Sequence, residues 1–140
     1  MPQLQIQELT EQARNQGRPF KVLIVDDEKW VCEVFRDFCN LTDVLEVEMA
    51  ANGAEAVEKA QKTTYDLITL DLIMPELSGL EVLTTIKEMN PGVPVMVITG
   101  NATEKLVNEA GVLGACKVLY KPVMLETFLA GITSTLVKHQ

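Results

Sequence analysis

The chain is poor in histidine, cysteine and aromatic residues, and it has no long apolar run. Its 140 residues include one histidine, three cysteines and 5% aromatics. No uninterrupted apolar stretch approaches the roughly 18 residues of a membrane span. The N-terminus lacks the basic-then-apolar order of a secretory signal. We therefore expect a cytoplasmic protein without a membrane segment.

The cysteines and the histidine offer no metal site. Cys32, Cys39 and Cys116 show no CxxC spacing and have no histidine nearby, and His139 stands next to the C-terminus. Cys32 and Cys39 fall in one predicted helix, roughly 10 Å apart and beyond disulfide reach. We interpret the cysteines as reduced, buried core residues and His139 as a solvated tail residue without a role.

Basic residues are also scarce. Twelve Lys and Arg stand against 20 Asp and Glu, which gives a formal net charge of −8. A nucleic-acid surface needs clustered Lys and Arg to displace phosphate counterions, so the composition argues against direct nucleic-acid binding. The expected partners are proteins or small ions. With 47% apolar residues, the chain is long enough for one compact core and too short for two.

The first 19 residues differ in composition from the rest. They hold five glutamines and close on Gly17-Arg18-Pro19, which is a turn signal. We expect an N-terminal extension over 1–19, either a short helix packed outside the domain or a flexible segment. A single domain is then predicted over 20–140.

Five strand-helix pairs follow this extension. The predicted strands are 20–25, 45–50, 65–70, 94–99 and 115–120, and the predicted helices are 28–41, 53–62, 79–90, 102–112 and 124–138. Most strands are continuous apolar runs, which indicates a parallel sheet buried on both faces. The second strand alternates apolar residues with Glu46 and Glu48, so it belongs at an edge. The sequence predicts an α/β fold with a doubly wound, five-stranded parallel sheet and helices on both faces.

Four of the apolar runs end on polar side chains. VLIV ends on Asp26 and Asp27, LITL on Asp71, VMVI on Thr99 and KVLY on Lys121. Crossovers between parallel strands are nearly always right-handed, so all the C-terminal strand ends face one edge, where such sheets bind ligands. We expect three carboxylates, a hydroxyl and an ammonium to meet there.

This set suits a divalent cation and a phosphoryl group. Two carboxylates about 4 Å apart repel by roughly 4 kcal/mol at an effective dielectric of about 20, so three need protons or a cation. Mg²⁺ prefers hard oxygens and leaves coordination open for phosphate, and Mn²⁺ is the alternative ion. The Asp71 carboxylate is then placed to attack phosphorus and form an acyl phosphate. Lys121 and Thr99 would hold phosphoryl oxygens.

Each of these residues also has a structural explanation. Asp26 and Asp27 precede a predicted helix, where acids cap free N–H groups. Asp71 could be a loop acid, Thr99 an ordinary strand-end hydroxyl and Lys121 a solvated lysine. Their joint placement after strands one, three, four and five favours a functional site over coincidence.

At these residues the chain resembles the receiver domain of two-component response regulators, the chemotaxis-regulator-like fold. The matching stretches are VLIVDDE at 22–28, YDLITLDLIMPELSGLEVL at 65–83, VMVITG at 95–100 and LYKP at 119–122. The spacing of 44 residues from Asp27 to Asp71 and of 22 from Thr99 to Lys121 is similar to the family's. The resemblance covers about residues 20–138 and implies a flavodoxin-like sheet of order 2-1-3-4-5.

The resemblance implies a phosphorylation switch rather than a conventional enzyme. Asp71 would accept a phosphoryl group from a sensor histidine kinase or a phosphotransfer protein and would later lose it by self-dephosphorylation. Thr99 and Lys121 would sense the phosphate, and the face over about 101–138 would bind a target protein. The resemblance also allows a phosphorylation-linked homodimer. Mg²⁺ would be held by four groups, namely Asp26, Asp27, Asp71 and the backbone carbonyl of Ile73.

The chain departs from the family's pattern at the switch residue. The family usually places an aromatic residue three positions before the lysine, where this chain has Val118. Tyr120 lies on the same face of the predicted strand, so we hypothesise that it substitutes.

Two positions that modulate water access in the family also differ here. Ile73 and Asn101 stand two residues beyond the phosphoacceptor and the threonine. An apolar Ile73 cannot orient a water, so we expect slow self-hydrolysis. The small Gly100 should leave the approach to Asp71 open.

Three other functions share parts of this pattern. An FMN carrier needs a phosphate-cradling first loop, and Asp26-Asp27-Glu28 would repel phosphate. A haloacid-dehalogenase-type phosphatase needs a second acid where Ile73 stands. A receiver-like module that binds protein without phosphate remains the main alternative, although the complete acid, Thr and Lys set counts against it. The sequence leaves open whether the regulator stands alone or is part of a longer chain.

Overall fold

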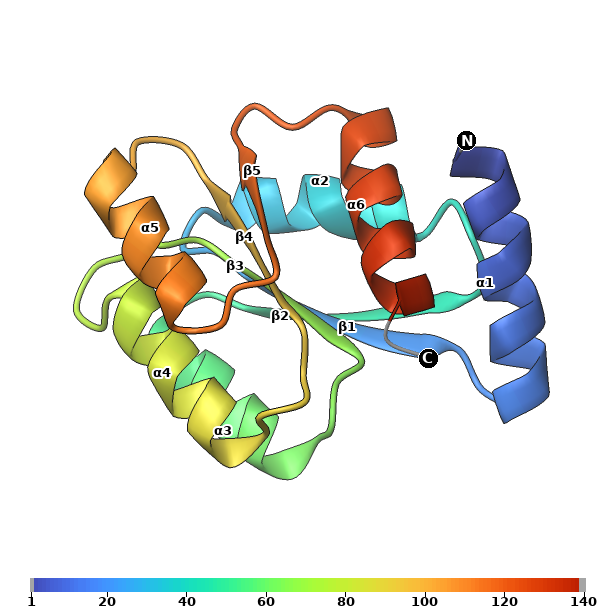
Figure 1. The fold of residues 1–140 in the computed structure, drawn as a ribbon, viewed down its shortest axis with the longest axis horizontal. Coiled ribbons are helices and arrows are strands. Elements are labelled where there is room, and N and C mark those ends of the chain that lie inside the picture. The colour runs from blue at the N-terminus through green and yellow to red at the C-terminus, as the bar shows by residue number, and fades with distance from the viewer. Residues whose placement is uncertain (1, 139–140) are drawn as a thin grey trace.

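The computed structural model describes residues 2–138, so the predicted tail residue His139 lies outside the described residues. Helices and strands alternate along the chain (Figure 1). The helices are α1 Pro2–Gln16, α2 Lys29–Cys39, α3 Gly53–Lys62, α4 Gly79–Met89, α5 Glu104–Val112 and α6 Leu125–Lys138. The strands are β1 Phe20–Val25, β2 Leu45–Ala50, β3 Leu67–Leu70, β4 Val95–Thr99 and β5 Lys117–Tyr120.

The five strands form one parallel sheet in the order β2-β1-β3-β4-β5. This confirms the predicted strand order and the edge position of the glutamate-bearing strand β2. Strands β1, β3 and β4 carry continuous apolar runs and occupy the centre of the sheet, where both of their faces are covered. β5 forms the second edge.

Helices cover both faces of this sheet (Figure 1). Helices α2 and α6 enclose the first apolar cluster, the α2/α6 cluster, in which the rings of Phe35 and Phe128 stack with centroids 4.6 Å apart. Helices α3, α4 and α5 enclose the second, the α3–α5 cluster, which includes Leu70, Leu83 and Ile86. The predicted doubly wound α/β architecture is confirmed.

Several elements begin later than predicted. β3 starts at Leu67 and β5 at Lys117, each two residues into its predicted run, which is the usual uncertainty at element ends. Helices α2 and α5 start one and two residues after the predicted starts at about 28 and at 102, because an N-cap residue precedes each helix. Glu28 is the extended N-cap of α2, and Thr103 is the N-cap of α5, where its side chain accepts a hydrogen bond from the Leu106 N–H.

The N-terminal segment forms a 15-residue helix that packs on α6 (Figure 1). Leu9 is fully buried and joins the α2/α6 cluster together with Ala13, so α1 is longer than expected and shares the core instead of lying outside it. Gly17 ends the helix with φ 77°, the left-handed conformation that glycine adopts readily. The Arg18 guanidinium lies 2.9 Å from the Asp66 carboxylate, and this ion pair links the segment after α1 to the residue before β3. The boundary at residue 19 stays a prediction.

The cysteines do not share one environment. Cys32 and Cys39 are buried in the α2/α6 cluster, whereas Cys116 is exposed. The prediction of three buried cysteines is therefore wrong for Cys116, because this residue precedes the edge strand β5. Among the described residues, no helix is long and apolar enough to cross a membrane.

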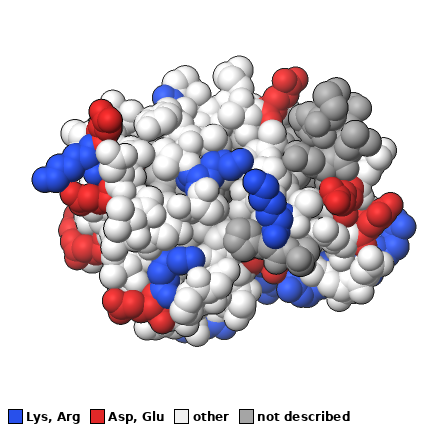
Figure 2. All heavy atoms as spheres, in the orientation of Figure 1, with Lys and Arg blue, Asp and Glu red and all other residues white. Residues whose placement is uncertain are grey.

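Charged side chains of both signs are interspersed on the face shown in Figure 2. Among the described residues visible there, lysines and arginines form no continuous patch. With the net charge of −8, this face offers no extended basic track for a phosphate backbone.

Candidate functional site

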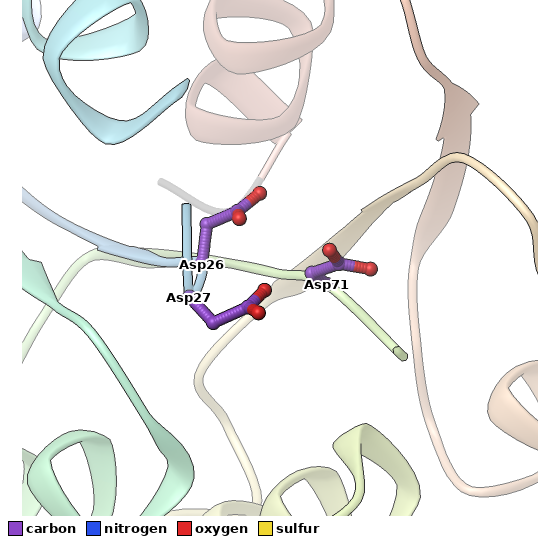
Figure 3. A group of neighbouring side chains, drawn as sticks. All are labelled: Asp26, Asp27 and Asp71. Carbon is purple, nitrogen blue, oxygen red and sulfur yellow. The ribbon is translucent and has the colours of Figure 1, made fainter. Parts of the chain in front are cut away.

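Polar side chains from four strands meet at the C-terminal edge of the sheet. Val25 of β1 pairs with Leu70 of β3, so the residues that follow them, Asp26 and Asp71, lie side by side. Asp27 joins them, and each of the three acids has an oxygen within 4.8 Å of the others. Figure 3 shows the two carboxylates that follow β1 beside the carboxylate that follows β3.

The Asp71 carboxylate is buried and held by three donors. Its Oδ1 accepts hydrogen bonds from the Thr99 hydroxyl and from the Ile73 backbone N–H, each at 3.0 Å. Its Oδ2 accepts one from the Lys121 ammonium, also at 3.0 Å. Because Asp71 is only 5% exposed, these donors fix the carboxylate at the floor of the site.

Lys121 is largely buried and bridges two of the acids. Its Nζ lies 2.6 Å from Asp26 Oδ2 and 3.0 Å from Asp71 Oδ2. The explanation of Lys121 as a solvated lysine is wrong. Burial disfavours its charge, but the hydrogen bonds that Lys121 donates to Asp26 and Asp71 outweigh that cost, so the pKa of Lys121 lies above the usual lysine value.

Asp26 is the most deeply buried of the three acids, at 2% exposure. Burial raises the pKa of the Asp26 carboxyl, the neighbouring Asp71 charge raises it further, and the hydrogen bond from Lys121 only partly offsets this. Asp26 also accepts a hydrogen bond from the Glu28 N–H at 2.9 Å, so it orders the loop before α2. A second positive charge in this pocket would favour the ionised form of Asp26.

The chemistry of the donor set fits a hard divalent cation. Asp26, Asp27 and Asp71 supply carboxylate oxygens from neighbouring positions, and Mg²⁺ is usually held by one or two carboxylates, further oxygens and waters. The side chain of Ile73 is half exposed, and its N–H already binds Asp71. The part played by its carbonyl oxygen stays a prediction.

A cavity of about 320 Å³ opens over the acids, and we call it the acid pocket. Its lining comprises Asp27, Glu28, Asp71, Ile73, Gly100, Asn101 and Lys121. The predicted modulating residues Ile73, Gly100 and Asn101 are thus at its rim. A Cβ added at Gly100 would make only ordinary contact with Lys121 Cβ at 3.8 Å, so a small side chain would also fit there.

The predicted switch residues alternate along β5. Val118 is half-buried against the α3–α5 cluster, and Leu119 packs on the opposite α2/α6 cluster. Tyr120 shares the side of Val118 by strand alternation and is 58% exposed at the end of the strand. Its role as a substitute switch aromatic stays a prediction.

Sequence reasoning missed a second cavity beside the acid pocket. A groove of about 290 Å³, the Trp30 groove, is lined by Glu28, Trp30, Val31, Val34, Phe35, Lys121, Pro122 and Val123. Trp30 is 65% exposed. The single tryptophan and the third acid of the DDE run were the signals available in the sequence, but only the fold brings them to the groove beside Lys121.

Comparison with known proteins places this geometry in a family. Residues 22–133 match the response regulator receiver domain. The chemotaxis protein CheY of Treponema pallidum (strain Nichols) is 32% identical over 122 residues, which cover 86% of this chain and 85% of that protein.

Solved structures show the same architecture. A CheY-like receiver domain protein from Methanospirillum hungatei JF-1 superposes with a TM-score of 0.83 at 26% identity, covering 86% of this chain and 96% of that one. Chemotaxis protein CheY4 of Vibrio cholerae superposes with a TM-score of 0.78 at 30% identity, covering 84% and 98%. The sheet order, the acid cluster and these matches together establish that the chain belongs to the response regulator receiver domain family of two-component systems.

Proposed function

We propose that this receiver domain is a phosphorylation-activated switch in which Asp71 accepts a phosphoryl group in a Mg²⁺-dependent reaction. Receiver domains are signalling switches and not conventional enzymes. The observation that carries the proposal is the buried Asp71 carboxylate, held by Thr99, Lys121 and the Ile73 N–H beside two further acids. The donor would be a phosphohistidine of a sensor histidine kinase or a phosphotransfer protein.

In the transfer step, an Asp71 oxygen forms a bond to phosphorus while the N–P bond of the phosphohistidine breaks. The electron pair of that bond stays on the histidine nitrogen, and an acyl phosphate remains on Asp71. The three donors hold the carboxylate in one orientation, so little reorganisation is needed as the donor approaches. Lys121, with its single positive charge, pairs with an oxygen of the incoming group. In the later self-dephosphorylation, a water oxygen forms a bond to phosphorus while the bond from the Asp71 oxygen to phosphorus breaks, so inorganic phosphate leaves and the Asp71 carboxylate is regenerated.

Asp26, Asp27 and Asp71, with the Ile73 carbonyl, would hold the cation. When bound, Mg²⁺ or Mn²⁺ neutralises phosphoryl oxygens and so permits a dianion to enter a pocket of acids. Without that neutralisation, the three carboxylates would repel the phosphoryl group. We therefore expect phosphorylation to require the cation.

The phosphorylation state of Asp71 would be transmitted to a partner through the face formed by α5, β5 and α6, about residues 101–138. Thr99 and Lys121 both bind Asp71 in the unphosphorylated state, and a phosphoryl group on Asp71 offers them new oxygen partners. Thr99 ends β4 just before the loop to α5, so a movement of Thr99 would displace that loop and the start of α5. Tyr120, exposed and adjacent to Lys121, is the proposed replacement for the usual switch aromatic.

The proposal includes a protein target and a cytoplasmic location. A downstream protein would bind the α5–β5–α6 face, and a phosphorylation-linked homodimer is the second kind of partner. If Tyr120→Ala leaves phosphorylation-linked binding at this face unchanged, Tyr120 has no switch role.

The deciding experiment locates the covalent label. The protein is incubated with Mg²⁺ and acetyl phosphate, and the added phosphoryl mass is mapped by mass spectrometry. We expect one phosphoryl group on Asp71 in the wild type, none in Asp71→Asn, and normal labelling of the control Asp37→Asn, whose side chain is 67% exposed on α2. Labelling that persists in Asp71→Asn would overturn the assignment. A wild type that stays unlabelled with Mg²⁺ present would favour the phosphate-independent binding module.

A further inference from the structure

The acid pocket and the Trp30 groove share two lining residues. Glu28 and Lys121 border both cavities, so their side chains form the wall between an apolar groove and the site around Asp71. Lys121 already has a place in the proposed function, whereas Glu28 has none. Its contacts therefore need their own explanation.

Glu28 is not occupied by the usual task of an acid at a helix start. It is the N-cap residue of α2, yet its side chain makes no capping hydrogen bond. Its Oε1 lies 3.8 Å from the Lys121 ammonium, and its Oε2 accepts a hydrogen bond from the Trp30 indole N–H at 3.2 Å. The Glu28 carboxylate thus lies between the lysine and the tryptophan instead of capping the helix.

Lys121 and a bound cation compete for the same acids. The ammonium now contacts Asp26 and Asp71, which are two of the three acids expected to hold the metal. When a divalent cation takes these carboxylates, Lys121 loses part of its counter-charge. Within residues 2–138, Glu28 is the only other carboxylate within 4.0 Å of the ammonium.

We propose that Glu28 is a positioning residue for Lys121. It offers the ammonium an alternative partner when the cation binds, and it keeps Lys121 at the wall of the acid pocket where an incoming phosphoryl oxygen can meet it. Trp30 fixes Glu28 in the orientation that reaches Lys121. This inference rests on the proposed function, because it assumes that the acid cluster binds Mg²⁺.

The test measures Mg²⁺ affinity by isothermal titration calorimetry without any phosphodonor. We expect Glu28→Gln to weaken Mg²⁺ binding about two- to fivefold, the range for a half-exposed charge pair, while the melting temperature without metal stays unchanged. Asp37→Asn removes the same formal charge from an exposed position on the same helix and should leave the affinity at the wild-type value. Trp30→Phe keeps the ring but lacks the donor, so it should weaken binding less than Glu28→Gln does.

Measurements in the Lys121→Met variant distinguish an effect of Glu28 on the position of Lys121 from the effect of the Glu28 charge alone. If Glu28 acts through Lys121, then adding Glu28→Gln to Lys121→Met should change Mg²⁺ affinity no more than Asp37→Asn does. Glu28→Asp keeps the charge but has a shorter reach, so it should resemble Glu28→Gln. Full affinity in Glu28→Asp, or an equal effect of Glu28→Gln with and without Lys121, would overturn the inference.

The two proposals fail in different ways. If the wild type binds no Mg²⁺, the proposed function fails and this inference falls with it. If the wild type binds Mg²⁺ and Glu28→Gln binds it equally well, the proposed function stands and only the role of Glu28 is rejected.

Discussion

Helices α4 and α5 cover the same face of the sheet, yet they are anchored to it very differently. α4 buries Val82, Leu83 and Ile86 against the central strands. α5 buries only Ala110, and Val112 at its end is 87% exposed. The strands beneath follow the same trend, since β3 and β4 are buried throughout whereas β5 is half-buried and exposed at its last residue.

This difference divides the domain into a fixed part, the central strands with α4, and a less firmly packed part, β5 with α5. Asp26, Asp71 and Thr99 stand at the ends of the buried central strands, where dense packing opposes displacement, whereas Lys121 follows the edge strand β5. α5 and β5 have fewer buried apolar residues, so less free energy is needed to move them. A signalling switch needs a firmly packed part and a less firmly packed part, because the site must keep its geometry while the conformation of another surface changes.

The largest expected effect is a loss of folding stability, which should be large at a buried leucine of α4 and small at the exposed valine of α5. Leu83→Ala should lower the free energy of unfolding by about 2–5 kcal/mol, because it leaves a cavity in the α3–α5 cluster. Val112→Ala should change it by less than about 0.5 kcal/mol. Urea denaturation measures both. Comparable losses in the two variants would mean that α5 is anchored as firmly as α4.

Helix α1 extends the comparison to the opposite face of the sheet. Leu9→Ala should cost about 2 kcal/mol, the low end for buried leucines, because a helix at the chain end can relax toward the gap. The neighbouring Glu8→Ala, on the exposed side of α1, should be neutral within about 0.5 kcal/mol. Urea denaturation again gives the values. Equal stability of Leu9→Ala and the wild type would show that α1 is dispensable for the core.

The acid cluster at the end of the fixed part should make stability depend on pH. Burial raises the pKa of Asp26, so the native state holds this proton more tightly than the unfolded chain does. The free energy of unfolding should therefore fall as pH rises above the ordinary carboxyl range of about 4. Asp26→Asn removes this titration and should be more stable than the wild type near neutral pH.

Thermal melts between acidic and neutral pH test the prediction for Asp26. The advantage of Asp26→Asn over the wild type should shrink as the pH falls, while Asp37→Asn should follow the wild type throughout. Added Mg²⁺ should raise the melting temperature of the wild type more than that of Asp26→Asn, because the variant lacks one carboxylate. A constant difference at every pH would contradict this account of Asp26.

The smallest expected effect concerns the rim of the acid pocket. Ile73→Asn should shorten the lifetime of phosphorylated Asp71 about two- to tenfold, since one hydrogen bond to the attacking water contributes about 0.5–1.5 kcal/mol. Ile73 lines the pocket and its side chain is half exposed, so the change should not disturb the core. A phosphate-release assay measures both lifetimes. Equal lifetimes in the wild type and Ile73→Asn would show that residue 73 does not control hydrolysis.

Local patterns were enough to predict most of the fold. Continuous apolar runs in β1, β3 and β4 indicated a sheet buried on both faces, and Glu46 and Glu48 marked β2 as an edge strand. Resemblance to receiver domains supplied the full strand order. The exact starts of α2 and α5 were missed, because capping at Glu28 and Thr103 depends on local geometry.

The order of residue types alone is enough to identify the polar groups at the strand ends, because each of them directly follows an apolar run. Their pairing follows from the three-dimensional fold. It placed Lys121 between Asp26 and Asp71, although 95 and 50 residues separate it from them. It also set Glu28 against both Lys121 and Trp30, and it buried Leu9 beneath α6. Such contacts depend on the register of strands and the packing of helices, which join residues that no local pattern connects.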